Sequence, residues 1–210
     1  MSKVLCVVCN PKSTEDSRSQ LVASHFLDEY KKTNPHSTIE TINLFEHPIP
    51  RIDHDVLNGW KKLRTGIEFE KLSADEKSKV KKIDESTHHF ASFEKYVFIT
   101  PMWNLGFPAE LKMYIDSVCV AGKTFAYTAA GPVGLLNDQG KKCMLIHAIG
   151  GFHQHKPEDH SEPYLRSIIN FMGIESFDSL VVEGVDALPA QTNAIINNAI
   201  EKAKVMARDF

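Results

Sequence analysis

The stretch KVLCVVC at residues 3–9 is apolar at almost every position, and the polar loop NPKSTEDSRS follows it at residues 10–19. An apolar run without alternation predicts a strand that is covered on both faces, as in a parallel sheet between two layers of helices. The next segment, residues 19–32, carries Val22, Phe26 and Tyr30 at helical spacing. The opening of the chain therefore predicts a strand, a polar loop and a helix at the edge of a parallel sheet.

The rest of the chain repeats this order of strand-like and helical patterns. A capping box at Ser73 and Glu76 opens one helix, Pro108 begins another at the first helical position, and Gly173 ends a third. Residues 48–72 match neither pattern. The predicted strands are residues 3–9, 38–44 (an edge strand), 96–100, 142–149 and 179–183, and the predicted helices are residues 19–32, 73–93, 108–118, 164–172 and 190–206.

This alternation predicts an α/β fold that forms a three-layer sandwich, with a five-stranded parallel sheet in the order 2-1-3-4-5 and helices on both faces. Ligands of such a sheet bind at the carboxyl ends of strands one, three and four. Because the sequence has no visible repeat or linker, we expect residues 1–210 to form a single domain.

Composition narrows the class of protein. The formal net charge is -3, and both signs are spread along the chain, so we expect no nucleic-acid partner. No apolar segment is long enough for a signal peptide core or a membrane span, so we expect a cytoplasmic protein. Cys6 and Cys9 match C-x-x-C, but residues three apart on a strand face opposite sides, which predicts inert buried thiols rather than a redox pair.

The loop at residues 10–19 is the first candidate for ligand binding. A helix N-terminus accepts phosphate readily, and Ser17 and Ser19 can add hydroxyl donors. The loop matches neither the glycine-rich pattern of nucleoside-triphosphate sites nor that of Rossmann dinucleotide sites. The alternative is a polar surface loop in which Ser17 only caps the helix.

Two further loops follow predicted strands. TPMWNLGFP at residues 100–108 places Trp103 and Phe107 at the carboxyl edge of the sheet, where a planar ligand with polar edges would use them. AIGGFH at residues 148–153 brings two glycines, which let backbone approach a ligand, and His153, which is a candidate to hydrogen-bond it. Turn residues and a flexible loop are the alternatives for these two segments.

Metal and nucleophile chemistry have weaker support. The histidines and acids at residues 153–160 lack the fixed helical spacing of a metal motif, so we expect no metal. The sequence contains no G-x-S-x-G and no evident catalytic Cys–His pair. This pattern favours chemistry that is carried by a bound cofactor.

With these loops in view, the sequence closely resembles the FMN-dependent NADH:quinone oxidoreductases with azoreductase activity, within the flavodoxin-like NAD(P)H-quinone reductase superfamily. Residues 101–104 resemble its P-M-[YW]-N motif, and residues 111–116 resemble its L-K-x-[YW]-x-D helix. Residues 121–135 match a family block nearly residue for residue. The resemblance spans nearly the whole chain, including residues 2–5, 17–19, 150–151, 163–165 and 171–174.

The resemblance implies a flavodoxin-like fold, FMN as cofactor, NADH or NADPH as electron donor, and two-electron reduction of quinones and reductive cleavage of azo compounds by a ping-pong mechanism. It also implies homodimers with active sites at the interface, to which Tyr127 and Phe171 would contribute from either subunit. The residues implied to contact the cofactor are Asn10, Ser17, Arg18, Ser19, Pro101, Met102, Trp103, Asn104, Leu105, Ala148, Ile149, Gly150 and Gly151, and those implied for substrate are Phe107, Tyr127, Phe152 and Phe171.

The chain departs from the family pattern at two places. Members often carry Ser-Arg where this chain has Ala148-Ile149, and Ser where it has Asn10. Backbone contacts would survive these changes, but side-chain contacts at the pyrimidine edge of the flavin would not. Two other functions therefore stay open, a flavodoxin-type electron-transfer module and a non-catalytic binding protein; the mild charge and the insertion at residues 124–138 favour the enzyme.

Overall fold

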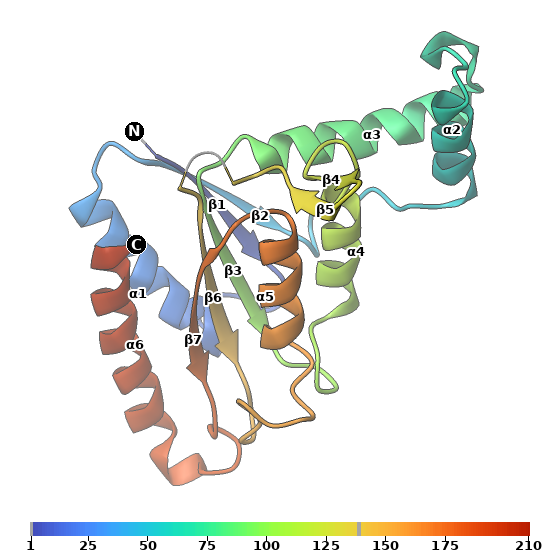
Figure 1. Cartoon of the computed structure of the whole chain (residues 1–210). Helices are drawn as coiled ribbons and strands as arrows, with labels where there is room; N and C mark the ends of the chain where they lie inside the picture. Colours follow the sequence, from blue (N-terminus) through green and yellow to red (C-terminus); the bar gives the residue numbers. More distant parts are fainter. Residues whose placement is uncertain (1, 138–139) are drawn as a thin grey trace.

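A five-stranded parallel sheet forms the centre of the computed structural model, which describes residues 2–137 and 140–210 (Figure 1). Its order is β2-β1-β3-β6-β7, which is the predicted order 2-1-3-4-5 when these five strands are counted along the chain. Every neighbouring pair in the sheet is parallel. The strands are β1 (Lys3–Val8), β2 (Thr38–Asn43), β3 (Lys95–Pro101), β6 (Lys142–Ala148) and β7 (Ser176–Val182).

Helices cover both faces of the sheet, as Figure 1 shows. α1 (Arg18–Thr33) and α6 (Thr192–Asp209) pack on one face, and α3 (Ala74–Ala91), α4 (Ala109–Val118) and α5 (Glu162–Phe171) pack on the other. Alternate residues of the opening apolar run enter the two cores, and Cys6 and Cys9 lie on opposite faces as predicted. Burial raises the pKa of both thiols to about 12, which keeps them inert.

A capping box and a proline in the sequence predicted where two of the helices begin. The capping box is present, because the Ser73 amide donates to Glu76 Oε2 at 2.9 Å and the Glu76 amide donates to Ser73 Oγ at 3.2 Å. Pro108 is the N-cap residue and not the first helical residue, since its ψ of 147° is extended and α4 begins at Ala109. A proline suits both positions because its missing N–H would have no helical partner in either.

The largest differences from the predicted bounds, three residues at one end, are in β7 and α6. β7 starts at Ser176 rather than at residue 179, because Ser176 and Phe177 pair with Lys142 and Cys143 of β6. α6 begins at Thr192 and continues to Asp209, where Ala207 and Phe210 are buried against the sheet. Both differences come from pairing and packing partners that are distant in the sequence.

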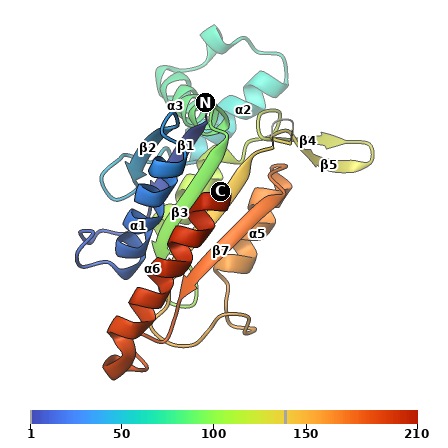
Figure 2. The same ribbon diagram turned by 90° about the vertical axis from the view of Figure 1, so that its left-hand side faces the viewer.

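The unassigned segment and the insertion form elements of their own. Residues 48–72 contain α2 (His54–Arg64) and a short 3-10 helix, Phe69–Lys71, and α2 packs on α3 at the end that projects beyond the sheet (Figures 1 and 2). The insertion contains an antiparallel hairpin of β4 (Phe125–Thr128) and β5 (Gly131–Gly134), while Asp138 at its end lies outside the described residues. A second 3-10 helix, Pro189–Gln191, precedes α6. In the described part of the chain, no helix combines the length and the apolar character that crossing a membrane requires.

Candidate flavin site

The three predicted loops meet at the carboxyl ends of β1, β3 and β6. They line a pocket of about 360 Å³ and an adjoining hollow of about 220 Å³, which share Met102, Ile149 and Gly150. Together these spaces gather every residue predicted to contact the cofactor. The pocket holds Asn10, Ser17, Arg18, Ser19, Pro101, Met102, Trp103, Ala148, Ile149 and Gly150, and the hollow adds Asn104, Leu105, Gly151 and His153.

One end of the pocket is the N-terminus of α1. Ser17 is the N-cap residue, and its Oγ accepts from the Gln20 amide at 3.3 Å and from Asn10 Nδ2 at 2.8 Å. Ser19 Oγ lies 3.3 Å from Ser17 Oγ, and both side chains are buried. The first amides of a helix have no partner within the helix and present a positive dipole end. Ser17 therefore caps the helix at a place that also suits a phosphate.

Charged groups surround this end of the pocket, and three of them, Lys12, Asp16 and Asp186, are not among the predicted site residues. Arg18 forms an ion pair with Asp186 at 2.7 Å, and Lys12 and Asp16 also line the pocket. Lys12 and Asp16 lie in the loop at residues 10–19, so their charges were the sequence signal that could have placed them at the site. Asp186 follows β7, and only the neighbouring position of β7 and β6 brings it to the pocket.

A tight turn presents the aromatic wall. The Trp103 amide donates to Gly106 O at 2.9 Å and the Gly106 amide donates to Trp103 O at 3.0 Å. Asn104 and Leu105 inside this turn have positive φ values of 50° and 66°, a conformation that costs energy for residues with side chains. The turn leaves Trp103 43% exposed beside the pocket, which is the arrangement a flat ligand needs.

The opposite wall is backbone. A Cβ on Gly150 would lie 2.2 Å from Asp186 Oδ2, so a side chain there would displace the Asp186 carboxylate from its present position. Ile149 is buried, and the amides of Ile149 and Met102 bond to Val182 and Ala148. The Ala148-Ile149 departure therefore removes side-chain polarity from this wall and leaves the backbone in place.

His153 lies in the smaller hollow. Its amide donates to Glu183 Oε2 at 3.2 Å, and its Nδ1 lies 3.5 Å from Glu158 Oε1. That separation permits an ion pair but not a good hydrogen bond, and Nδ1 is otherwise buried without a partner among the described residues. His153 is thus held in place by its backbone while its ring remains available to a ligand.

The four residues predicted to contact substrate do not join these spaces. In the described part of the chain, neither hollow is lined by Phe107, Tyr127, Phe152 or Phe171. Tyr127 is 76% exposed on β4, and Phe171 packs against Phe125 with the two rings tilted by 52° and their centroids 4.6 Å apart. Phe107 packs on His147 at 5.3 Å, and the Phe152 ring lies against Gly184. Their substrate roles stay predictions.

His147, near the end of β6, is a buried histidine that contacts two neighbouring segments of the site. His147 Nδ1 contacts Thr100 O at 3.1 Å, and its Nε2 contacts Ser161 Oγ at 3.0 Å, while Ser161 Oγ also contacts Asp159 Oδ1. Burial lowers the pKa of His147 to about 4, so the ring is neutral near pH 7. His147 thereby links the loop after β3 to the segment that precedes α5.

We expect this histidine to make stability depend on pH. Because its pKa is lower in the folded state than the ordinary 6.5, the unfolded chain binds more protons between these values, and stability falls as pH drops below about 6.5. The loss between about pH 7.5 and about pH 5 should reach about 2 kcal/mol. Urea unfolding at both pH values measures it. A His147→Gln variant should lose less over the same range, and an equal loss in that variant would contradict the assignment.

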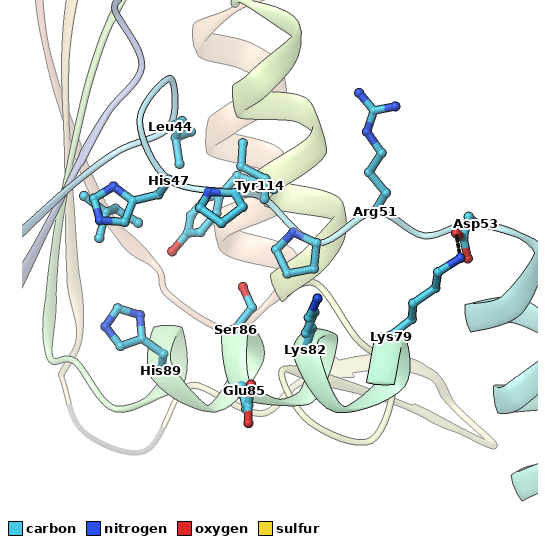
Figure 3. A pocket seen from close by; sticks show the side chains of 14 residues that line it. Leu44, His47, Arg51, Asp53, Lys79, Lys82, Glu85, Ser86, His89 and Tyr114 are labelled. Atoms are coloured by element: carbon cyan, nitrogen blue, oxygen red, sulfur yellow. Dashed lines mark hydrogen bonds and ion pairs between the residues drawn. The ribbon is translucent and has the colours of Figure 1, made fainter. Parts of the chain in front are cut away.

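A further cavity lies away from the flavin site. It measures about 510 Å³ and is lined by the segment after β2, by α3 and by Tyr114 of α4 (Figure 3). It shares no lining residue with the other two spaces. Within residues 2–137 and 140–210, no group of three or more His, Cys, Asp or Glu side chains is placed to hold a metal ion.

Comparisons with known proteins agree with this site. Residues 2–206 match the family described as having a flavodoxin-like fold. The FMN-dependent NADH:quinone oxidoreductase of Geotalea uraniireducens (strain Rf4) is 56% identical over 210 residues, which cover 100% of both chains. The azoreductase from Bacillus anthracis str. Sterne is 34% identical with a TM-score of 0.91 and 100% coverage of both chains. The FMN-dependent NADH-azoreductase from Bacillus anthracis str. Ames Ancestor, whose structure is in complex with FMN, is 33% identical with a TM-score of 0.90, covering 99% of this chain and 98% of that one. The chain therefore belongs to the family of FMN-dependent NADH:quinone oxidoreductases and azoreductases, with a flavodoxin-like fold.

Proposed function

We propose that this protein uses FMN to pass two electrons from NADH to quinones and to cleave azo compounds reductively. The supporting observation is that one pocket joins a hydroxyl-lined helix N-terminus to an exposed indole. FMN has a phosphate at one end and a planar ring at the other, so the residues present fit it. The names of the relatives, which include NADH and FMN, support the same choice of donor and cofactor.

The residues of the chain itself would bind FMN and orient it. Ser17, Ser19 and the first amides of α1 hold the phosphate, and Trp103 and its turn hold the ring. When bound, FMN supplies the hydride chemistry, so the protein needs little acid–base apparatus. His153 is the nearest candidate to donate a hydrogen bond or a proton to a substrate in the smaller hollow. One hollow beside the ring implies that donor and acceptor use it in turn, which is a ping-pong mechanism.

The test begins with the purified protein. It should be yellow, and NADH added without oxygen should bleach it, after which a quinone or an azo dye should restore the colour. Chromatography of the flavin released by heat should show FMN. Colour without bleaching by NADH would instead indicate an electron-transfer module, and FAD as the main species would reject the cofactor assignment.

Trp103 offers a prediction about the ring end of the pocket. We expect Trp103→Ala to retain FMN, because the phosphate contacts are untouched, while the steady-state constants for NADH and quinone change. A contact between two aromatic rings, such as the Trp103 indole and the flavin, contributes about 1 kcal/mol, so FMN affinity should fall less than about tenfold. Fluorescence titration and steady-state kinetics measure the two effects. Trp103→Phe should restore most of the kinetics, and unchanged constants in the alanine variant would contradict the role.

We also propose that the protein is a homodimer. The β4–β5 hairpin exposes Tyr127 on one face and Val133 on the other, and the exposed Leu135 follows it, so this segment offers apolar surface that a partner would cover. A second copy covering this surface would bring Tyr127 and Phe171 toward a shared substrate site. Sedimentation equilibrium of the FMN-loaded protein should give twice the chain mass of 23.6 kDa. The monomer mass at micromolar concentration would remove the proposal.

Residues 1–210 would act as one FMN-binding domain, since the family match extends over residues 2–206. The four cysteines are all unpaired thiols, which supports a reducing compartment and therefore the cytoplasm. Limited proteolysis tests whether the chain forms one domain, because a single domain should resist cleavage between β3 and β6.

A further inference from the structure

The cavity beside α3 has an apolar wall and a defined floor. The segment after β2, with Leu44, lies opposite α3, and the ring of Tyr114 forms the floor (Figure 3). Ile49 and Pro50 also line the cavity. Its volume of about 510 Å³ is in the range of small-molecule sites, which bury an apolar body and fix it with a few polar groups. The question is which polar groups are available to a ligand.

The inner polar group is the hydroxyl of Tyr114. The residue is only 5% exposed, and among the described residues its hydroxyl has no hydrogen-bond partner. Figure 3 shows the hydroxyl directed into the space between the loop and α3. A buried hydroxyl without a partner costs free energy, so an acceptor supplied by a ligand would be favourable at this place.

Ser86 next to it offers the complementary group. Ser117 Oγ gives its proton to Tyr114 O at 2.8 Å, so Ser86 must be the donor in its 3.2 Å contact with Ser117. The lone pairs of Ser86 Oγ are then left to accept. A ligand hydroxyl could accept from Tyr114 and donate to Ser86 at the same time.

The outer polar group is Lys82. It has no ion pair within the described part of the chain, and Figure 3 shows its ammonium rising from α3 toward the segment after β2. Lys79 beside it is held by Asp53 at 2.6 Å, and His89 is held by Glu40 at 2.7 Å. Glu85 is turned away from the loop in the same view. Arg51 also lines the cavity, but its guanidinium is directed away from α3 in Figure 3. Lys82 is therefore the cation that α3 offers to an anionic group.

We propose that this cavity is a second small-molecule site, which binds a planar hydroxy-aromatic carboxylate. The ring lies between Leu44, Ile49 and the Tyr114 ring, the hydroxyl meets Tyr114 and Ser86, and the carboxylate meets Lys82. The proposal stands on the geometry of this cavity alone and is independent of the flavin pocket.

Three related probes test it on FMN-saturated protein by calorimetry. 6-Hydroxy-2-naphthoate carries both polar groups, 2-naphthoate lacks the hydroxyl, and 2-naphthol lacks the carboxylate. We expect the hydroxynaphthoate to bind most tightly. Tyr114→Phe should weaken it about three- to tenfold and remove its advantage over 2-naphthoate. Lys82→Ala should weaken both carboxylates about three- to fivefold, since the ion pair is exposed, and should leave 2-naphthol unchanged.

The controls separate binding from folding. Lys81→Ala removes a neighbouring lysine that does not line the cavity and should change no affinity. Tyr114→Phe should raise the melting temperature of the unliganded protein by about 2–4 °C, because it deletes a buried hydroxyl that lacks a partner. The proposal would be overturned if none of the three probes showed saturable binding, which is the result expected if a second copy of the chain fills the cavity. Equal effects of Lys82→Ala and Lys81→Ala would also overturn it.

Discussion

The Ser17→Ala/Ser19→Ala double variant should bind FMN at least about 100-fold more weakly than the natural protein. Each hydrogen bond to a charged phosphate that is lost costs about 1.5–3 kcal/mol, and every 1.4 kcal/mol is a factor of ten in affinity. Both hydroxyls lie at the N-terminus of α1 and line the pocket. Fluorescence titration of the apoprotein with FMN measures the loss.

Two controls separate phosphate binding from helix capping. Riboflavin has no phosphate, so its affinity should be the same for the variant and the natural protein. Ser17 also caps α1, so the double variant should lose about 1 kcal/mol of stability in the apoprotein. Ser19→Ala alone removes no cap and should weaken FMN without lowering the melting temperature. An FMN affinity that stays unchanged in the double variant would reject the phosphate assignment.

Gly134→Ala should produce the largest loss of stability among the substitutions considered. A Cβ on Gly134 would lie 2.2 Å from the Gly173 nitrogen and 2.5 Å from the Met172 carbonyl carbon. These are backbone atoms, and the 2.9 Å bond from the Leu136 amide to Met172 O holds the two segments together. The variant must therefore move the hairpin away from the end of α5, at a cost of about 3 kcal/mol or more.

Urea unfolding measures this cost, and the melting temperature should fall by about 6–12 °C. Gly106→Ala is the matched control, because a Cβ there meets nothing within 4 Å. If the hairpin helps to form the dimer, Gly134→Ala should also shift the sedimentation equilibrium toward the monomer. A loss of stability below about 1 kcal/mol would show that the hairpin and α5 are less tightly packed than the structure describes.

The sequence predicted which loops lie together where the loops directly follow strands of the sheet. Asn10, Trp103 and Gly150 lie in loops that directly follow strands, and the carboxyl ends of parallel strands share one edge. The position of these loops therefore followed from the order of the strands. The aromatic residues at 107, 127, 152 and 171 were harder to place, because no strand end determines where they lie.

Residues 48–72 contain a helix that the predicted elements did not include. α2 packs on α3 beyond the sheet rather than across it, and only Val56 and Gly59 of α2 are buried. The segment nevertheless carries Val56, Trp60 and Leu63 at helical spacing, so a periodic signal for this helix was present in the sequence. The Asp53 side chain, which accepts from the Asp55 and Val56 amides, was the local signal for its start.

By itself, the sequence determined the strand order, the two-sided core and the edge of the sheet where the three candidate loops meet, because burial patterns and loop positions are properties of short segments. The tertiary structure alone decided that Asp186 meets Arg18, that Ser17 caps α1 while facing the pocket, and that Tyr114 directs a hydroxyl without a protein partner into a second cavity. Each of these depends on side chains that meet only when distant segments pack together, and no local pattern of residues encodes such a meeting.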